Sequence, residues 1–383
     1  MKRLFTLLAV VLMSLAALTG CGPKEAETIK IGVNLELTGE VSVYGTPEKL
    51  AFQLAVKEIN AKGGIDGKQV ELVVYDNAYD TAKAVENATK LATVDNVVAM
   101  LGSATSAPTL AIGPVAKQYE VLTFTPSGTN AKVTMDGNAV NPWVFRACFI
   151  DPFQGLVLAN FASNTLQAKK AVVMGSSSSD YAKDLAAIFG EKFAANGGEV
   201  LTVEYYTDAD TDFSAQLTTI KGLGEFDVLF VADYAARAGL IIGQARAMGI
   251  DVAIIGPDGF ESPDLNDLAG GAANVSNVYF STHFSTLSTD AKVQNFITAY
   301  TAETGEAPSA LSALAYDAAY MLFAAIESAG TDPVKVRDAL KATKNFAGVT
   351  GTISFDDLNN PIKSAVVVKL ENGVQVEASI VNP

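Results

Sequence analysis

Residues 97–130 read VVAMLGSATSAPTLAIGPVAKQYEVLTFTPSGTN, and the pattern of this segment indicates the class of fold. Two short apolar runs, Val97–Leu101 and Val121–Phe124, each end in a small, hydroxyl-rich corner, and a helical pattern separates them. The first corner is residues 102–108 and the second is residues 125–130. Strands that alternate with helices predict a parallel sheet covered on both faces. Because ligands bind beyond the carboxyl ends of parallel strands, we expect the two corners to lie together in a site.

The same alternation continues along the chain and predicts an α/β fold with two doubly wound parallel-sheet lobes. A first series of strands and helices runs from residue 28, and a second begins after a hinge near residues 146–151. The other predicted strands are Ile29–Leu35, Val70–Tyr75, Ala171–Met174, Glu199–Tyr206, Phe226–Ala232, Val252–Ile255 and Val278–His283, followed by two late strands at residues 351–361 and 364–373. We assign residues 28–148 and 283–355 to lobe 1, and residues 149–282 and 356–383 to lobe 2.

Length and composition limit the class of protein. The chain has 383 residues, 49% of them hydrophobic, which is enough for two cores. Its net charge of −15 argues against a nucleic-acid partner, which would need a basic face. No cluster of His and Cys offers a zinc site, so we expect no metal and no cofactor.

The N-terminus has the pattern of a secretory signal. Residues 1–20 begin with Lys2 and Arg3 and continue with an apolar stretch that is too short for a comfortable membrane span. The following LTGC, ending at Cys21, resembles a bacterial lipoprotein signal, in which the cysteine carries the lipid. An ordinary signal peptide cut nearby is the alternative. Residues 21–27 then form a polar tether, and Cys148, in an apolar setting, is expected to be a buried thiol without a disulfide partner.

The corners offer chemistry for an anion. Thr105 or Ser106 can cap the helix that begins in APTLAIGP, and a helix N-terminus presents free N–H groups and partial positive charge. Hydroxyls of Ser106 and Thr129 would complete a cradle for a carboxylate without any Lys or Arg. Plain capping and turn chemistry is the alternative for either corner alone.

Motifs over nearly the whole mature chain carry a family resemblance: IKIGVNLELTGEVSVYG, AVKEINAKGGIDGKQVELVVYDNAYD, TFTPSGTN, FRACFIDPFQG, GQARAMGI, GPDGF and LAYDAAY. In these the chain resembles the leucine/isoleucine/valine-binding type of periplasmic binding protein, a substrate-binding component of ABC transporters. The resemblance implies a type I clamshell, with two lobes joined by a three-segment hinge and a ligand enclosed between them.

The resemblance also implies roles for individual residues. It gives the ligand carboxylate to Ser106, Thr129 and backbone near Ala104 and Ser127, and the ligand amine to Asp258 with Asp151 as a second contact. The aromatic positions of the site are Tyr44, Tyr181 and Tyr234. Better-known members have a disulfide at the positions of Tyr79 and Thr105, and often an aromatic residue at the position of Leu311. The resemblance therefore does not decide the shape of the pocket near Thr105 and Leu311. Asp258 in Pro-Asp-Gly could instead be a turn residue, Tyr44 and Tyr181 could lie on the surface, and we expect His283 to be structural.

These features favour a binding protein over an enzyme. No Gly-x-Ser-x-Gly elbow or Walker loop is present, and a catalytic triad could use only His283. We expect an extracytoplasmic monomer, anchored to the bacterial membrane by a lipid on Cys21, that delivers a small amino acid, aliphatic or branched-chain, to an ABC permease and ATPase. An amide, a urea-like molecule or an aromatic acid is the alternative ligand, and a receptor-coupled sensor is the alternative role.

Overall fold

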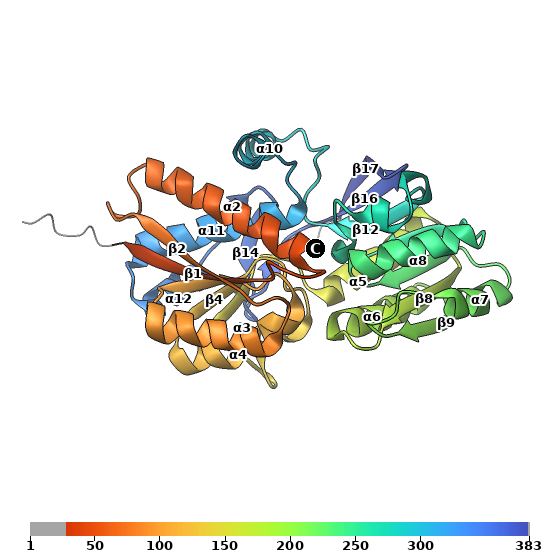
Figure 1. Cartoon of the computed structure of the whole chain (residues 1–383), viewed down its shortest axis with the longest axis horizontal. Helices are drawn as coiled ribbons and strands as arrows, with labels where there is room; N and C mark the ends of the chain where they lie inside the picture. Colours follow the sequence, from red (N-terminus) through yellow and green to blue (C-terminus); the bar gives the residue numbers. More distant parts are fainter. Residues whose placement is uncertain (1–27, 382–383) are drawn as a thin grey trace, which may run out of the picture.

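Two large β-sheets with helices packed against them dominate residues 28–381, the part of the chain that the computed structural model describes (Figure 1). The predicted lipoprotein signal and Cys21 lie outside these residues. The strands predicted up to His283 are confirmed to within two residues at their ends, whereas the late strand predicted over residues 351–361 ends at Phe355. The α/β fold class with two parallel-sheet lobes is therefore confirmed.

The first sheet has the strand order β2-β1-β3-β4-β7, and all its strands are parallel. The strands are β1 (Ile29–Leu35), β2 (Val70–Asp76), β3 (Ala99–Gly102), β4 (Leu122–Thr125) and β7 (Val144–Arg146). The helices of this lobe are α2 (Ser42–Ala61), α3 (Thr81–Lys90), α4 (Ser106–Tyr119), α11 (Ala310–Ala329) and α12 (Pro333–Lys341). Leu101 pairs in register with Val33 and Phe124, so β3 and β4 end side by side and bring the two corners together.

The second sheet has the order β17-β16-β12-β11-β10-β8-β9. Its parallel strands are β8 (Lys170–Ser176), β9 (Glu199–Tyr206), β10 (Val228–Ala232), β11 (Ala253–Gly256) and β12 (Val278–Thr282), and antiparallel β16 (Ala365–Glu371) and β17 (Val374–Val381) complete one edge. The helices here are α5 (Asp151–Asn160), α6 (Asp180–Ala195), α7 (Ser214–Gly222), α8 (Ala235–Ala247) and α9 (Leu265–Leu268). Neighbouring residues Leu229 and Phe230 belong to apolar clusters on opposite faces, so both faces of this sheet are covered.

The chain passes between the two sheets three times. The first passage lies between β7 and α5, the second between β12 and α10 (Ala291–Thr304), and the third between β15 (Pro361–Ile362) and β16. β15 pairs with β14 (Gly351–Phe355), which also pairs with β13 (Phe346–Gly348). The small sheet extends to Ile362, seven residues (362 − 355) past the predicted end of lobe 1 at residue 355, because Pro361 and Ile362 still pair with β14. A two-stranded ribbon, β5 (Met135–Asp136) and β6 (Ala139–Val140), follows the second corner.

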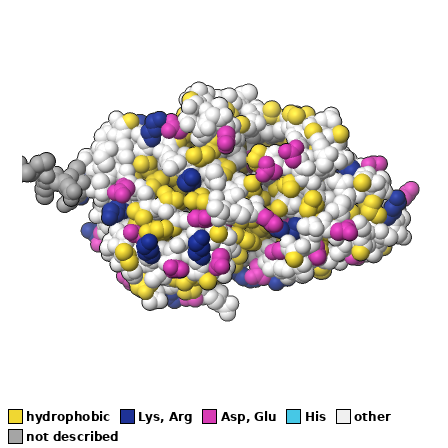
Figure 2. Space-filling model, in the orientation of Figure 1, with side chains coloured by type: hydrophobic (Ala, Val, Ile, Leu, Met, Phe, Trp, Pro, Cys, Tyr) yellow, Lys and Arg dark blue, Asp and Glu magenta, His cyan; other side chains and the backbone are white. Residues whose placement is uncertain are grey.

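Burial follows the predicted pattern. Cys148 is fully buried as a free thiol, and burial raises its pKa. Within the described residues, α11 is the one helix long and apolar enough to cross a membrane, but 78% of its most apolar window is buried in the fold. On the face shown in Figure 2, basic side chains are scattered among acidic ones and form no continuous basic patch.

Candidate functional site

A small cavity lies between the two sheets, where the carboxyl ends of their strands face each other. The cavity is narrow, with about 20 Å³ of space open to a water-sized molecule, well below the usual volume of a small-molecule pocket, so a ligand would need the two walls to move apart. The cavity is lined by Tyr44, Ala104, Thr105, Ser127, Thr129, Tyr181, Tyr234, Asp258, Gly259 and Leu311. Nine of the eleven predicted site residues are in this wall. The other two, Ser106 and Asp151, are buried next to it rather than in it.

The first corner is held by a glutamate that sequence reasoning missed. Glu36 directly follows β1 and is fully buried. Its carboxylate accepts hydrogen bonds from the N–H of Ala104 (2.9 Å) and from the N–H and hydroxyl of Thr105 (3.1 and 2.5 Å). The backbone N–H of Ala104 is therefore engaged within the protein. The hydroxyl of Ser106 accepts from the N–H of Asn130 (3.1 Å), so its own hydrogen can be donated elsewhere.

A buried cation holds the backbone of the second corner in place. Arg146, at the end of β7, donates from Nη1 to the carbonyls of Gly128 and Asn130, both at 2.8 Å. The hydroxyl of Thr125 donates to the carbonyl of Ser103 (2.6 Å), which ties this corner to the first. A fully buried guanidinium needs such partners, because an unsatisfied charge in the core is costly. The two corners therefore form one rigid wall.

The opposite wall carries a buried carboxylate. Asp258 opens a short 3₁₀ turn, η4 (Asp258–Phe260), directly after β11. The hydroxyl of Tyr181 donates to Asp258 Oδ1 (2.9 Å), and Nε2 of His283 lies 3.2 Å from Oδ2. Burial lowers the pKa of His283 to about 4, so the ring is neutral near pH 7 and donates from Nε2–H. Among residues 28–381, no Lys or Arg forms an ion pair with Asp258, and the neutral ring of His283 carries no charge, so no protein cation balances the negative charge of Asp258.

The backbone of this acidic turn is oriented by an amide from α5. Gln154 accepts the N–H of Asp258 (2.8 Å) and the hydroxyl of Ser281 (2.6 Å) through Oε1. Its Nε2 donates to Oδ1 of Asp151 (3.2 Å), while Oδ2 of Asp151 is buried without a partner. Burial raises the pKa of Asp151 to about 8. Asp151 thus reaches Asp258 through Gln154, and its contact with a ligand stays a prediction.

Three tyrosines close the cavity. The ring of Tyr234 stacks on Tyr181 with 4.8 Å between centroids and lies 5.4 Å from that of Tyr44. The hydroxyl of Tyr44 donates to the carbonyl of Gly259 (2.6 Å) and accepts the N–H of Ala235 (2.9 Å). Tyr44 belongs to α2 in lobe 1, whereas its two partners belong to lobe 2, so these bonds hold the lobes together. The alternative of surface positions for Tyr44 and Tyr181 is wrong, since both are at most 3% exposed.

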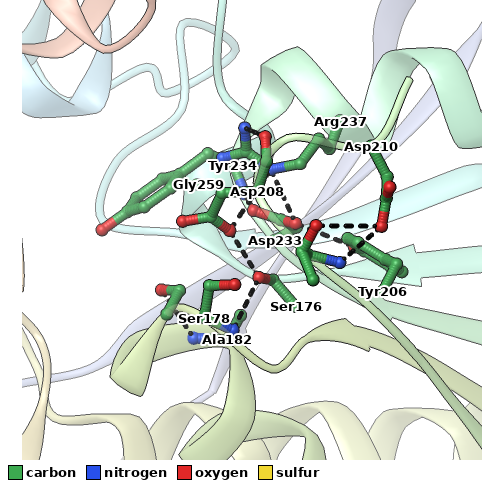
Figure 3. Close-up of polar contacts among 12 residues, drawn as sticks. Ser176, Ser178, Ala182, Tyr206, Asp208, Asp210, Asp233, Tyr234, Arg237 and Gly259 are labelled. Atoms are coloured by element: carbon green, nitrogen blue, oxygen red, sulfur yellow. Dashed lines mark hydrogen bonds and ion pairs between the residues drawn. The ribbon is translucent and has the colours of Figure 1, made fainter.

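A polar network behind Tyr234 fixes the start of α8 (Figure 3). Asp233 accepts the N–H of Tyr234 (2.6 Å), the hydroxyl of Tyr206 (2.8 Å) and Nε of Arg237 (3.0 Å). The ring of Tyr234 points away from this network in Figure 3. Arg237 also reaches Glu40 of lobe 1 (3.3 Å). The network therefore locks the aromatic wall and adds an ion pair between the lobes.

The position of the missing disulfide is filled by other contacts. Thr105 is held by Glu36, and the ring of Tyr79 meets that of Tyr234 edge to face at 6.5 Å. The sequence analysis did not identify Glu36, Gln154 or Glu48, a residue of α2 that is hydrogen-bonded with Ser127, and it took His283 as structural only. The position of Glu36, one residue beyond a buried strand, was the signal that could have found it.

Residues 28–375 match the family described as periplasmic binding protein. The chain belongs to this family. It is 31% identical over 334 residues, 87% of each chain, to the leucine-, isoleucine-, valine-, threonine- and alanine-binding protein of Pseudomonas aeruginosa. Among solved structures it is similar to the branched-chain amino acid transporter substrate-binding protein LivJ of Streptococcus pneumoniae in complex with isoleucine. That pair shares 42% identity and a TM-score of 0.88, covering 93% of this chain and all of the other.

The leucine-binding protein LivK of Thermotoga maritima is also similar, with 34% identity, a TM-score of 0.86, and coverage of 93% of this chain and 99% of the other. The resemblance drawn from the sequence motifs is thus confirmed. Periplasmic binding proteins of this kind are substrate-binding components of transporters and not enzymes, and their location is extracytoplasmic.

Proposed function

We propose that this protein captures one aliphatic or branched-chain α-amino acid between its lobes. The observation that carries the proposal is the opposition of two walls in one small cavity. One wall presents the unbalanced carboxylate of Asp258, and the other presents hydroxyls without any basic side chain. This arrangement suits a zwitterion whose ammonium faces Asp258.

The opposite end of such a ligand would be a carboxylate at the corners. Thr129 lines the cavity there, and Ser106 beside it has a free hydroxyl hydrogen. The first-turn N–H groups of α4 have no partners within their own helix and add partial positive charge. Hydrogen bonds to both charged groups offset the cost of removing them from water. Leu311 and the tyrosine rings supply the apolar part of the cavity lining, which an aliphatic side chain of the ligand would contact.

We further propose that the protein acts as an extracytoplasmic, lipid-anchored monomer that delivers its ligand to an ABC permease and ATPase. The LTGC sequence ending at Cys21 and the transporter relatives support this role. The named ligands of the relatives, among them isoleucine and leucine, guide the choice of probes. Closure around the ligand would use the contacts that Tyr44 and Arg237 make across the lobes.

The test is a ligand screen on the mature chain, starting after Cys21 and refolded to remove any carried-over ligand. A compound that binds only the folded state raises the melting temperature with its concentration. We expect L-isoleucine, L-leucine or L-valine to do so, and the matching α-keto acids, which lack the amine, to be inactive. Stabilisation by amides or aromatic acids alone would overturn the proposed ligand class.

A further inference from the structure

A second buried glutamate lies directly behind the wall of the cavity, and the function described above does not use it. Glu48 belongs to α2, one turn after Tyr44, and its side chain is fully buried. Its Oε1 is hydrogen-bonded with Oγ of Ser127, a residue that lines the cavity. Its Oε2 is buried without any hydrogen-bond partner.

Counting hydrogens fixes the protonation state of this pair. Oγ of Ser127 contacts two oxygens, Oε1 of Glu48 and the carbonyl of Ala104 at 2.6 Å. A serine hydroxyl has one hydrogen, and a backbone carbonyl can only accept. The serine must therefore donate to Ala104, and the remaining contact needs a hydrogen supplied by Glu48. An ionised Glu48 would leave one O···O contact without a hydrogen and would bury an unsatisfied charged oxygen, which is costly.

The neighbouring glutamate shows the opposite arrangement. Glu36 faces three donors, the N–H and hydroxyl of Thr105 and the N–H of Ala104, which suits an accepting carboxylate. Its negative charge is close enough to raise the pKa of Glu48 further, after the larger effect of burial. Glu36 and Ser127 are the polar groups that face Glu48, and no cation among the described residues offsets that effect. Burial raises the pKa of Glu36 as well, but the hydrogen bonds that it accepts from Thr105 and Ala104 oppose this rise, so hydrogen bonding favours the ionised form at Glu36 and the protonated form at Glu48.

We propose that Glu48 is a positioning residue that stays a neutral carboxylic acid, donates to Ser127, and so adds no second negative charge beside that of Glu36 at the carboxylate end of the bound ligand. The chain of hydrogen bonds runs from Glu48 through Ser127 to the carbonyl of Ala104 and spans both corners. It fixes the distance between the two corners, and because Glu48 is neutral, the ligand carboxylate does not face a second like charge in addition to Glu36. The positioning of the protein's own corners is independent of the ligand, whereas the effect on the ligand carboxylate rests on the proposed function.

The first test reads the proton itself. Infrared difference spectra of the mature wild-type protein and Glu48→Gln at pH 7 should show the loss of one protonated-carboxyl C=O band in the variant. Loss of an ionised-carboxylate band instead would overturn the proposal. Circular dichroism checks folding, and Glu48→Met serves in the same measurement if Glu48→Gln does not fold.

The second test uses thermal unfolding between pH 5 and pH 8. A carboxyl group whose folded pKa is raised stabilises the fold below its unfolded pKa, and this stability is lost as pH rises toward the folded pKa. Glu48→Gln should therefore gain stability relative to wild type as pH increases. Glu36→Gln is the matched control, because it turns an amide N–H toward existing donors and should be destabilised over the same range. Equal responses of the two variants would contradict the assignment.

The third test separates positioning from packing with L-isoleucine as the probe. Gln can still donate to Ser127, whereas Met of similar shape cannot, so Glu48→Met should bind at least about tenfold more weakly than Glu48→Gln. Equal affinities would overturn the positioning role. If wild type shows the protonated band but binds no amino acid, the proposed function fails while the protonation state stands.

Discussion

Replacing Asp258 by Asn removes one negative charge from the cavity and little else. The remaining Oδ1 can still accept from the hydroxyl of Tyr181, which lies 2.9 Å away, and the side-chain volume is unchanged. Asp258 is 8% exposed, so solvent screens its charge only weakly. Truncating one partner of a buried, hydrogen-bonded charge pair costs about 2–5 kcal/mol of binding free energy. We therefore expect the Kd for L-isoleucine to rise by about 30-fold to several thousand-fold.

The cost to folding should be smaller and has a separate source. The new amide N–H faces Nε2–H of His283, 3.2 Å away in the native pair, so the neutral ring must move its hydrogen to Nδ1. Nδ1 is buried without a partner, and leaving a buried donor unsatisfied costs about 1–3 kcal/mol. Removal of a buried negative charge offsets part of this cost.

Isothermal titration calorimetry of the refolded wild type and Asp258→Asn measures the change in Kd, and thermal unfolding without ligand measures the change in stability. Glu261→Gln is a useful control, because Glu261 is a carboxylate of the same region outside the cavity wall. A loss of affinity below about threefold would refute the assignment of Asp258 to the ligand amine. A decrease in unfolding free energy as large as the decrease in binding free energy would refute it as well.

Three further variants test other parts of the site. Tyr44→Phe loses the hydrogen bonds to Gly259 and Ala235 that join the lobes, so the Kd for isoleucine should rise about tenfold. Small-angle scattering with ligand should then show a more open molecule. An unchanged Kd would contradict this role of Tyr44. In the wild type, stability is lost as pH falls from 6.5 to about 4, because the buried ring of His283 stays neutral while the unfolded ring protonates. His283→Gln should lack this loss, so the slope of its unfolding free energy against pH in that window should be smaller by up to about 1.4 kcal/mol per pH unit. A slope identical to that of the wild type would contradict the neutral state of the ring. Arg146→Met should weaken isoleucine binding and lower the unfolding free energy by about 1.5–3 kcal/mol in chemical denaturation, because two carbonyls of the second corner lose a charged donor.

The fold was predictable because its signals are local. Apolar runs such as Ile29–Leu35 are bounded by polar corners and followed by helical patterns, and β1 has these same ends. The third passage between lobes was harder to place, since Pro361 and Ile362 form a two-residue strand that has no periodicity of its own. Pairing with β14, a non-local contact, decides their position.

The wall of the site was predictable where a motif or a strand end points to it, as for Thr129, Asp258 and Tyr234. The residues behind the wall were not. Glu48 lies in the middle of a helix, and its role follows from hydrogen bonding to Ser127, 79 positions further along the chain. His283 and Asp258 meet only because β11 and β12 are neighbours in the sheet. Such contacts depend on tertiary packing, which no local pattern encodes.

The proposed ligand, one α-amino acid, would span the cavity between Asp258 and the two corners. A crystal structure of the refolded protein with L-isoleucine would show where each end of the ligand lies. We expect the ammonium within hydrogen-bond distance of the Asp258 carboxylate, and the carboxylate on the hydroxyls of Ser106 and Thr129. A ligand bound elsewhere, or in the reverse orientation with its carboxylate toward Asp258, would contradict it.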